Sequence, residues 1–350
     1  IEILKKGGNA VDAAIATAAV LAVVEPAMTG IGGDCFAIIS KPGKKLIALN
    51  ASGKAPKGAT PEWFASKGIS QIEMQSPHAV TVPGAIDGWA RLLKDHGTMS
   101  FAEVLAPAIE FADRGFVVAP RVAHDWAAAT DKVKANPAAA RHLLKDGRAP
   151  SVGEVMSFPA LAKTLKAIAK DGRDGFYAGA VAADMVAELK ALGGVHVAAD
   201  FEAQSCSYVD TLSVGYRGVD LHELPPNNHG IVALILLKML AKMGKLSSSP
   251  TAPERYHGMM EASRLAYAMR DRFVADPAMA KVPVEFMLDD KTIANLVKRI
   301  DLKKRTEDLG PVPEPKGTDT VCFSIVDEKG MAISFINSVF SSFGSGLAAP

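Results

Sequence analysis

The chain has 350 residues, of which 49% are hydrophobic, and its formal net charge is +1. This length and apolar content are enough to bury a large core, in one big domain or two. Lys and Arg are spread along the chain, so the composition gives no basic stripe for nucleic acid and no acidic tail for a charged partner.

The cysteines and histidines give no sign of a metal centre. Cys35, Cys206 and Cys322 stand far apart, so they form neither a C-x-x-C pair nor a disulfide framework. The 8 histidines show no H-E-x-x-H or similar ligand spacing. We therefore expect neither a metal ion nor another cofactor.

The first strong element of the chain is a helix. Asn9 can cap it, and a Glu-Pro pair ends it after about Val24. Its core, AVDAAIATAAVLAVV, is too short to span a bilayer and carries Asp12, so we expect a buried helix and no membrane span in this segment. The sequence begins with Ile1 rather than Met, so we expect a segment of a longer protein whose localisation is not readable.

Further helices follow with recognisable ends. Ser100 and Glu103 form an S-x-x-E capping box, and Gly115 fits the C-terminal stop of the helix that they begin. Thr251 and Glu254 repeat this box before another helical run. Two more stretches combine helical periodicity with a terminal glycine, ALAKTLKAIAKDG and AVAADMVAELKALGG.

Strand-like runs alternate with these helices. They are CFAIIS, KKLIALN, TLSVGYRGVDLHEL and VCFSIVD, and the segments SKPGKKLI and VDEKGMAI are typical of hairpin turns. Strands in hairpins, interleaved with capped helices, predict a layered α+β protein.

The last hairpin brings two hydroxyl groups together. Its turn is predicted at Asp327–Gly330, and folding back over this turn with one bulged residue pairs Val326 with Ala332. The same register pairs Thr320 with Ser338, directly after a proline-rich stretch. Such a pair is ordinary in sheets, where it stabilises neighbouring strands, but it is also an arrangement in which one hydroxyl can be a nucleophile.

The stretch KKGGNAVDAAIATAAVLAVVEPAMTGIGGDCFAII resembles the opening of the γ-glutamyltranspeptidase family. The similarity continues in the family's order over almost the whole chain, through HGTMSFAEVLAPAIEFADRGFVV, YRGVDLHELPPNNHG and DTVCFSIVDEKGMAISFINSVFSSFGSG. This resemblance implies an N-terminal nucleophile hydrolase fold of the α+β class, in which two antiparallel sheets are stacked between layers of helices.

The resemblance also implies self-cleavage. Members of the family are made as one inactive chain and cut themselves before a threonine, which aligns with Thr320, so the expected cut lies between Asp319 and Thr320. Residues 1–319 would then be the large-subunit region and 320–350 the start of the small-subunit region, held together as a heterodimer. Thr318 is a competing nucleophile outside the strand.

The implied site consists of Thr320 as nucleophile and Ser338 at the position of a second hydroxyl. The family's substrate-binding arginine would fall at Ser52, with Lys54 nearby, and a substrate-binding asparagine would fall near Phe340. Neither family residue is present, so the expected pocket is less polar.

The implied function is cleavage of γ-glutamyl or related acyl amides such as glutathione, with transfer of the acyl group to water or an amine. The alternatives are an acylase for non-glutamyl amides, such as glutaryl amides, and an inactive member of the family.

Four other features receive structural interpretations. TGIGGDC lacks the G-x-G-x-x-G pattern and predicts close packing of a helix on a strand, or else a lining of the pocket. We expect Cys322 to be a small core residue, His229 to be an exposed loop residue, and Arg270–Arg272 to form a solvated or salt-bridged helix face.

Overall fold

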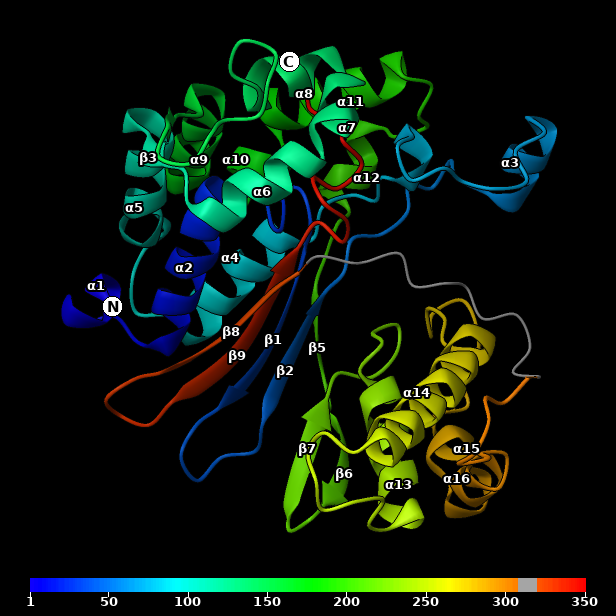
Figure 1. Ribbon diagram of the computed structural model, residues 1–350. Helices are drawn as coiled ribbons and strands as arrows, with labels where there is room; N and C mark the ends of the chain where they lie inside the picture. Colours follow the sequence, from blue (N-terminus) through cyan, green and yellow to red (C-terminus); the bar gives the residue numbers. More distant parts are fainter. Residues whose placement is uncertain (308–319) are drawn as a thin grey trace. The chain divides into compact units, whose positions relative to one another are not determined.

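A five-stranded sheet organises the larger of two structural units (Figure 1). The computed structural model describes residues 1–307 and 320–350. Of these, residues 1–45, 49–208 and 320–350 form the larger unit, and residues 46–48 and 209–307 form the smaller one.

The strand order in the five-stranded sheet is β5-β2-β1-β9-β8. Strand β9 runs antiparallel to both of its neighbours, β1 and β8. The strands are β1 (Asp34–Ser40), β2 (Ile47–Ala51), β5 (Ser207–Val209), β8 (Val321–Val326) and β9 (Ala332–Ser338).

Helices α2 and α4 cover one face of this sheet (Figure 1). Every second side chain of β9 is buried on that face, including Ile333, Phe335 and Asn337. The side chains between them lie on the opposite, more open face, and this face carries Ser338. The period-2 alternation of the sequence therefore decides which residues meet the helices and which meet the open side.

The larger unit also contains many short helices and a two-stranded sheet. They are α1 (Glu2–Lys5), α2 (Ala10–Val24), α3 (Pro61–Ser66), a 3-10 helix (Pro77–Ala79), α4 (Ala85–His96), α5 (Phe101–Arg114), β3 (Phe116–Val117), α6 (Pro120–Ala128), α7 (Thr130–Lys134), α8 (Pro137–Leu143), β4 (Val155–Met156), α9 (Pro159–Asp171), α10 (Asp174–Tyr177), α11 (Gly179–Ala191) and α12 (Ala198–Glu202).

The smaller unit has its own apolar core. Ile235 and Met239 from one helix pack with Leu265 from another and with Ile293 from a third. Its elements are β6 (Leu212–Tyr216), β7 (Val219–Glu223), α13 (Ile231–Met243), α14 (Pro253–Phe273), α15 (Val284–Leu288) and α16 (Asp290–Val297).

The helix ends match the sequence except at one position. Asn9 caps α2, and the Ser100–Glu103 capping box begins α5 as predicted. The capping box predicted from Thr251 and Glu254 is wrong, because α14 begins after Ala252, whose side chain offers no acceptor. A proline at the first helical position fixes the backbone there without a capping hydrogen bond.

The last hairpin has the predicted register. Val326 pairs with Ala332, and Gly330 adopts a φ of 77° in the turn between them. The carboxylate of Asp327 also accepts a hydrogen bond of 3.1 Å from the backbone N–H of Ala10, at the start of α2. The turn is thereby fixed to the helix beneath the sheet, which in turn fixes where the first residue of β8 lies.

Candidate active site

Thr320 and Ser338 meet at one end of the sheet. Thr320 directly precedes β8, Ser338 ends β9, and their side-chain oxygens lie 3.1 Å apart, a distance at which either hydroxyl can donate a hydrogen bond to the other. The backbone N–H of Phe340 donates a second hydrogen bond of 2.9 Å to Ser338 Oγ. The predicted meeting of the two hydroxyls is thus confirmed, and Ser338 Oγ is held from two sides.

Thr320 is exposed on the open face of the sheet. The same alternation places Cys322 on that face, so the expectation that Cys322 is a core residue is wrong. A residue two positions from Thr320 on a strand must point the same way, so the hydroxyl and the thiol share one side. Asp319 and Thr318 lie outside the described residues.

Gly33 allows the chain before β1 to pass close to Ser338. A Cβ atom at Gly33 would collide with the backbone carbonyl of Ser338, so a larger residue would push the two segments apart. TGIGGDC thus allows close packing as predicted, but the packing is between the turn before β1 and the end of β9 and involves no helix. It brings the turn before β1 against the residue that holds Thr320.

A buried amide stabilises this end of β9 from the other face. Asn337 is fully buried and accepts a hydrogen bond of 3.1 Å from Trp89 Nε1 on α4. Its own amide nitrogen donates to Thr29 Oγ1 at 2.8 Å and to the carbonyl of Gly30 at 3.0 Å. Asn337 therefore ties together β9, α4 and the turn before β1.

Sequence reasoning missed Asn337, although a signal was present. It occupies an inward position of the alternating run ISFIN, where the preceding inward residues are Ile333 and Phe335. A polar residue in such a position needs buried partners, because an unpaired buried amide is costly.

The loop after β2 is fixed by three side chains. The consecutive backbone N–H groups of residues 52–54 donate to Asn50 Oδ1, Asp34 Oδ1 and Gln204 Oε1, at 3.1, 2.8 and 3.2 Å respectively. The hydroxyl of Ser52 donates a further hydrogen bond of 2.7 Å to Asn50 Oδ1. The backbone donors of this loop are therefore already engaged within the protein.

This loop lies at the same end of the sheet as Thr320. Asp34 is the register partner of Ser338 across β1 and β9, and Ser338 contacts Thr320 on the other side. Neighbouring strands are roughly 5 Å apart, so the backbones of Asp34 and Thr320 are separated by about 10 Å. The hydrogen bond between Asp34 and this loop therefore places the loop near the two hydroxyls, and the loop includes Ser52, where the family resemblance would put the arginine.

A second network holds the loop from behind. Gln204 Nε2 donates to the carbonyl of Ser52 at 2.9 Å, and Arg173 donates to the carbonyl of Gln204 at 2.6 Å. Arg173 also forms an ion pair of 2.6 Å with Asp87, which accepts a hydrogen bond from the backbone N–H of Cys206. Sequence reasoning missed this network, because its members lie on α4, α10 and the segment before β5 with no shared motif.

Burial shapes the charge state of Asp34. Desolvation raises the pKa of its carboxyl group to about 6, while the backbone hydrogen bond from Gly53 opposes this rise by stabilising the ionised form. The Asp34 carboxylate is therefore ionised at neutral pH but takes up a proton in mildly acidic solution.

The other residues named from the sequence make ordinary surface contacts or are exposed. Lys54 Nζ reaches Ser205 Oγ at 3.4 Å, and Arg270 forms an ion pair with Asp271 at 2.6 Å, as predicted for a salt-bridged helix face. His229 is exposed, as predicted. Phe340 is 59% exposed and has a φ of 72°, a conformation that asparagine adopts more readily than phenylalanine.

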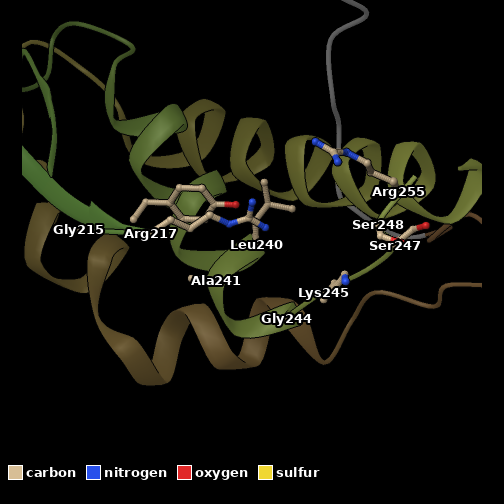
Figure 2. Close-up of a pocket in the computed structure, with 10 residues that line it drawn as sticks. Gly215, Arg217, Leu240, Ala241, Gly244, Lys245, Ser247, Ser248 and Arg255 are labelled. Atoms are coloured by element: carbon tan, nitrogen blue, oxygen red, sulfur yellow. The ribbon is translucent and has the colours of Figure 1, made fainter. Parts of the chain in front are cut away.

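A pocket in the smaller unit contains none of these residues. It has a volume of about 630 Å³, and Arg217, Lys245 and Arg255 are among the residues that line it (Figure 2). In the described part of the chain, no group of three or more His, Cys, Asp or Glu residues could hold a metal ion. No helix among residues 1–307 and 320–350 is long and apolar enough to cross a membrane.

A sequence model of the family described as gamma-glutamyltranspeptidase matches residues 1–350. The glutathione hydrolase-like YwrD proenzyme of Bacillus subtilis is 35% identical over 99% of this chain and 65% of that protein. The oxamate amidohydrolase proenzyme of Klebsiella pneumoniae is 34% identical over 100% of this chain and 66% of that protein. The chain therefore spans about two thirds of the length of these relatives.

Solved structures show the same fold. A cephalosporin acylase from Bacillus halodurans matches with a TM-score of 0.89 and 36% identity, over 100% of this chain and 65% of that one. The gamma-glutamyltranspeptidase of Helicobacter pylori matches with a TM-score of 0.80 and 27% identity, over 90% of this chain and 94% of that one. The predicted α+β fold class, that of the N-terminal nucleophile hydrolases, is confirmed.

The role of Asn337 can be tested by its replacement. Asn337→Ala leaves the Trp89 N–H and the Thr29 hydroxyl without their partner, and each such buried group costs about 1–3 kcal/mol. We expect the urea midpoint of the full-length protein to fall accordingly. Ser334→Ala, at an exposed position of the same strand, is the matched control. Equal midpoints for the two variants would contradict the role assigned to Asn337.

Proposed function

The chain belongs to the γ-glutamyltranspeptidase family, and on this premise we propose that it is a self-cleaving amidohydrolase or acyltransferase with Thr320 as its nucleophile. The observation that carries the proposal is the 3.1 Å contact between the side-chain oxygens of Thr320 and Ser338. In an inactive member of the family, the same pair would only stabilise the two neighbouring strands.

The proposed maturation step is an intramolecular acyl shift. The hydroxyl oxygen of Thr320 attacks the carbonyl carbon of Asp319, the peptide C–N bond breaks, and the proton of the hydroxyl ends on the released nitrogen. Water then opens the resulting ester, giving a carboxyl group on Asp319 and a free α-amine on Thr320. The two pieces stay together, because β9 of the smaller piece pairs with β1 of the larger piece along its whole length.

In the proposed turnover, the free α-amine of Thr320 acts as the general base for its own hydroxyl. The hydroxyl oxygen attacks the substrate carbonyl, and the amine group of the substrate leaves with a proton. The acyl group remains on Thr320 Oγ1 as an ester until water or an acceptor amine removes it. Ser338 holds the attacking oxygen in place, which matters because rate depends steeply on the geometry of attack.

The loop at Ser52 gives a reason to expect a preference for one kind of acyl group. A γ-glutamyl substrate carries an α-carboxylate that an arginine fork would hold, and Ser52 offers no such fork. The backbone N–H groups of residues 52–54 do not replace it, since they donate to Asn50, Asp34 and Gln204. We infer that the preferred substrates are amides of acyl groups with a less polar head than the α-amino acid of a γ-glutamyl group. A glutaryl group keeps the carboxylate and lacks only the α-amine, whereas a butyryl group carries neither.

The comparisons favour amide cleavage, but the names of the similar proteins refer to several different acyl groups. Similar proteins carry the names glutathione hydrolase-like proenzyme, oxamate amidohydrolase and cephalosporin acylase. Cleavage of γ-glutamyl amides such as glutathione is therefore the second candidate. In that case Lys54, two residues from Ser52, is the nearest cation of this loop, but a single ammonium gives a weaker hold than a guanidinium fork.

The first prediction concerns maturation of the full-length protein. Mass spectrometry should find a new N-terminus at Thr320 after purification and incubation. Thr320→Ala removes the attacking oxygen and should abolish the cut, whereas Thr320→Ser keeps it and should permit the cut. Thr318→Ala is the control and should be processed normally. A wild-type chain that stays intact, or a cut that persists in Thr320→Ala, would contradict the proposed nucleophile.

A second prediction separates positioning from stability at Ser338. Ser338→Ala removes the hydrogen bond to Thr320 and the one that Phe340 N–H donates, and each contributes only about 1 kcal/mol of folding stability. Misplacing a nucleophile can cost on the order of 100-fold in rate. We therefore expect much slower cleavage and turnover in a protein that still folds, with only a modestly lowered melting temperature. Unchanged kinetics would reduce Ser338 to an ordinary sheet residue.

A third prediction concerns the acyl group. Ser52→Arg should raise kcat/KM for γ-glutamyl anilide relative to butyryl anilide, which has no carboxylate, because the variant introduces the missing fork. A charge-assisted hydrogen bond contributes about 1.5–3 kcal/mol, so the ratio should change by roughly 10- to 150-fold. Ser52→Lys is the matched control and should give a smaller change. A wild-type enzyme that already strongly prefers γ-glutamyl anilide would overturn the substrate assignment.

A further inference from the structure

The carboxylate of Asp34 is a partly buried titratable group that the proposed mechanism leaves unused. We propose that Asp34 is a positioning residue of the active site: it fixes the loop of residues 52–54 to the sheet row that carries Ser338 and Thr320. This inference rests on the proposed function and assigns a further residue to the same site.

The geometry places Asp34 between the two halves of the site. Its backbone pairs with Ser338 in the sheet, and its side chain accepts the N–H of Gly53 at 2.8 Å. The backbone N–H of Gly84, at the start of α4, donates to the carbonyl of Gly33, directly before Asp34. One residue therefore connects the row of hydroxyls to the loop that stands where the family's arginine would be.

The charge of Asp34 strengthens its hydrogen bond with Gly53. An ionised carboxylate accepts this N–H in a charge-assisted hydrogen bond, whereas an asparagine amide accepts it only as a neutral group. Gly53 also has no room for a side chain, since a Cβ there would collide with the carbonyl of Val82. The loop therefore has little freedom to move while the hydrogen bond to Asp34 persists.

No cation compensates the buried charge of Asp34 in the described part of the chain. The nearby basic groups are occupied elsewhere, because Arg173 pairs with Asp87 and Lys54 reaches Ser205. The adjacent Cys35 is buried, and its thiol pKa lies well above the usual value, so it stays neutral. The carboxylate thus depends on the Gly53 N–H, and in return it holds that residue in place.

Burial raises the pKa of Asp34 to about 6, which gives the proposal a measurable consequence. The ionised form accepts the Gly53 hydrogen bond most strongly, so the loop is held more firmly above this pH and more weakly as the pH falls through it. The free α-amine of Thr320 titrates separately, with an ordinary pKa of about 7.7–8.0, and must be unprotonated to act as a base. Two groups must therefore lose a proton before the site is competent.

The test is the pH profile of kcat/KM for glutaryl anilide on the processed full-length protein. Two required deprotonations give a logarithmic slope of about two below pH 6, whereas Asp34→Asn should give a slope of about one, since only the amine remains. The variant should also lose on the order of 10- to 100-fold in kcat/KM at neutral pH. Asp113→Asn, at an exposed ion pair of the same unit, is the matched control and should keep the wild-type profile.

Hydrogen exchange of the loop supplies a readout that needs no activity. At one fixed pH near neutrality, peptides covering residues 49–56 should exchange faster in Asp34→Asn than in wild type or Asp113→Asn. Faster exchange in a protein that cleaves no amide would refute the proposed function and uphold the Asp34 contact. An active variant that keeps the wild-type slope, or exchange equal to wild type, would overturn the proposal. In the wild type alone, a slope of about one below pH 6 would contradict it as well.

Discussion

The antiparallel pairing of β9 with both β1 and β8 is the constraint on which the rest of the site depends. Because direct partners in a sheet point to the same face, this pairing places Thr320, Ser338 and Asp34 in one row at one end of the sheet. A slip of one residue would turn the hydroxyls toward the helices and the apolar residues toward the open face. The register is fixed by the turn after β8 and by the contact of Asp327 with α2.

Buried polar groups keep this row in place. On the covered face, Asn337 satisfies partners from α4 and from the turn before β1. On the open face, the loop of residues 52–54 is held by side chains from three different segments. Each of these groups would be costly to leave unpaired, so the two faces hold the end of β9 and its neighbours in a single arrangement. The same fully engaged loop offers no free backbone donor to the head of an acyl group, so it favours an acyl group with a less polar head than γ-glutamyl.

The sequence allowed local features of the fold to be predicted well, because they depend on neighbouring residues. The caps of α2 and α5 follow from side chains three residues apart, and the meeting of Thr320 and Ser338 follows from one turn and a period of two. The prediction of a side-chain cap for α14 was wrong, because a proline there made a capping side chain unnecessary. The expectation that Cys322 is buried was also wrong, although its alternation with Thr320 already placed it on the open face.

The features that escaped prediction depend on distant residues. Gln204 lies 150 positions from its partner Lys54, and Trp89 lies 248 positions from Asn337. No local pattern connects such residues, since the fold alone brings them together. The family resemblance located Ser52 and Thr320 but gave no information about Asp34, whose role depends on the three-dimensional path of two glycine-containing segments.

The most direct test of the account is to trap the acyl-enzyme. Processed full-length protein would be mixed with glutaryl anilide, quenched in acid within the first turnover, digested and analysed by mass spectrometry. The account predicts an added glutaryl group on the peptide that begins with Thr320, and no such peptide from Thr320→Ala. A glutaryl group on the nearby Cys322, or release of aniline without any acyl group on Thr320, would contradict it.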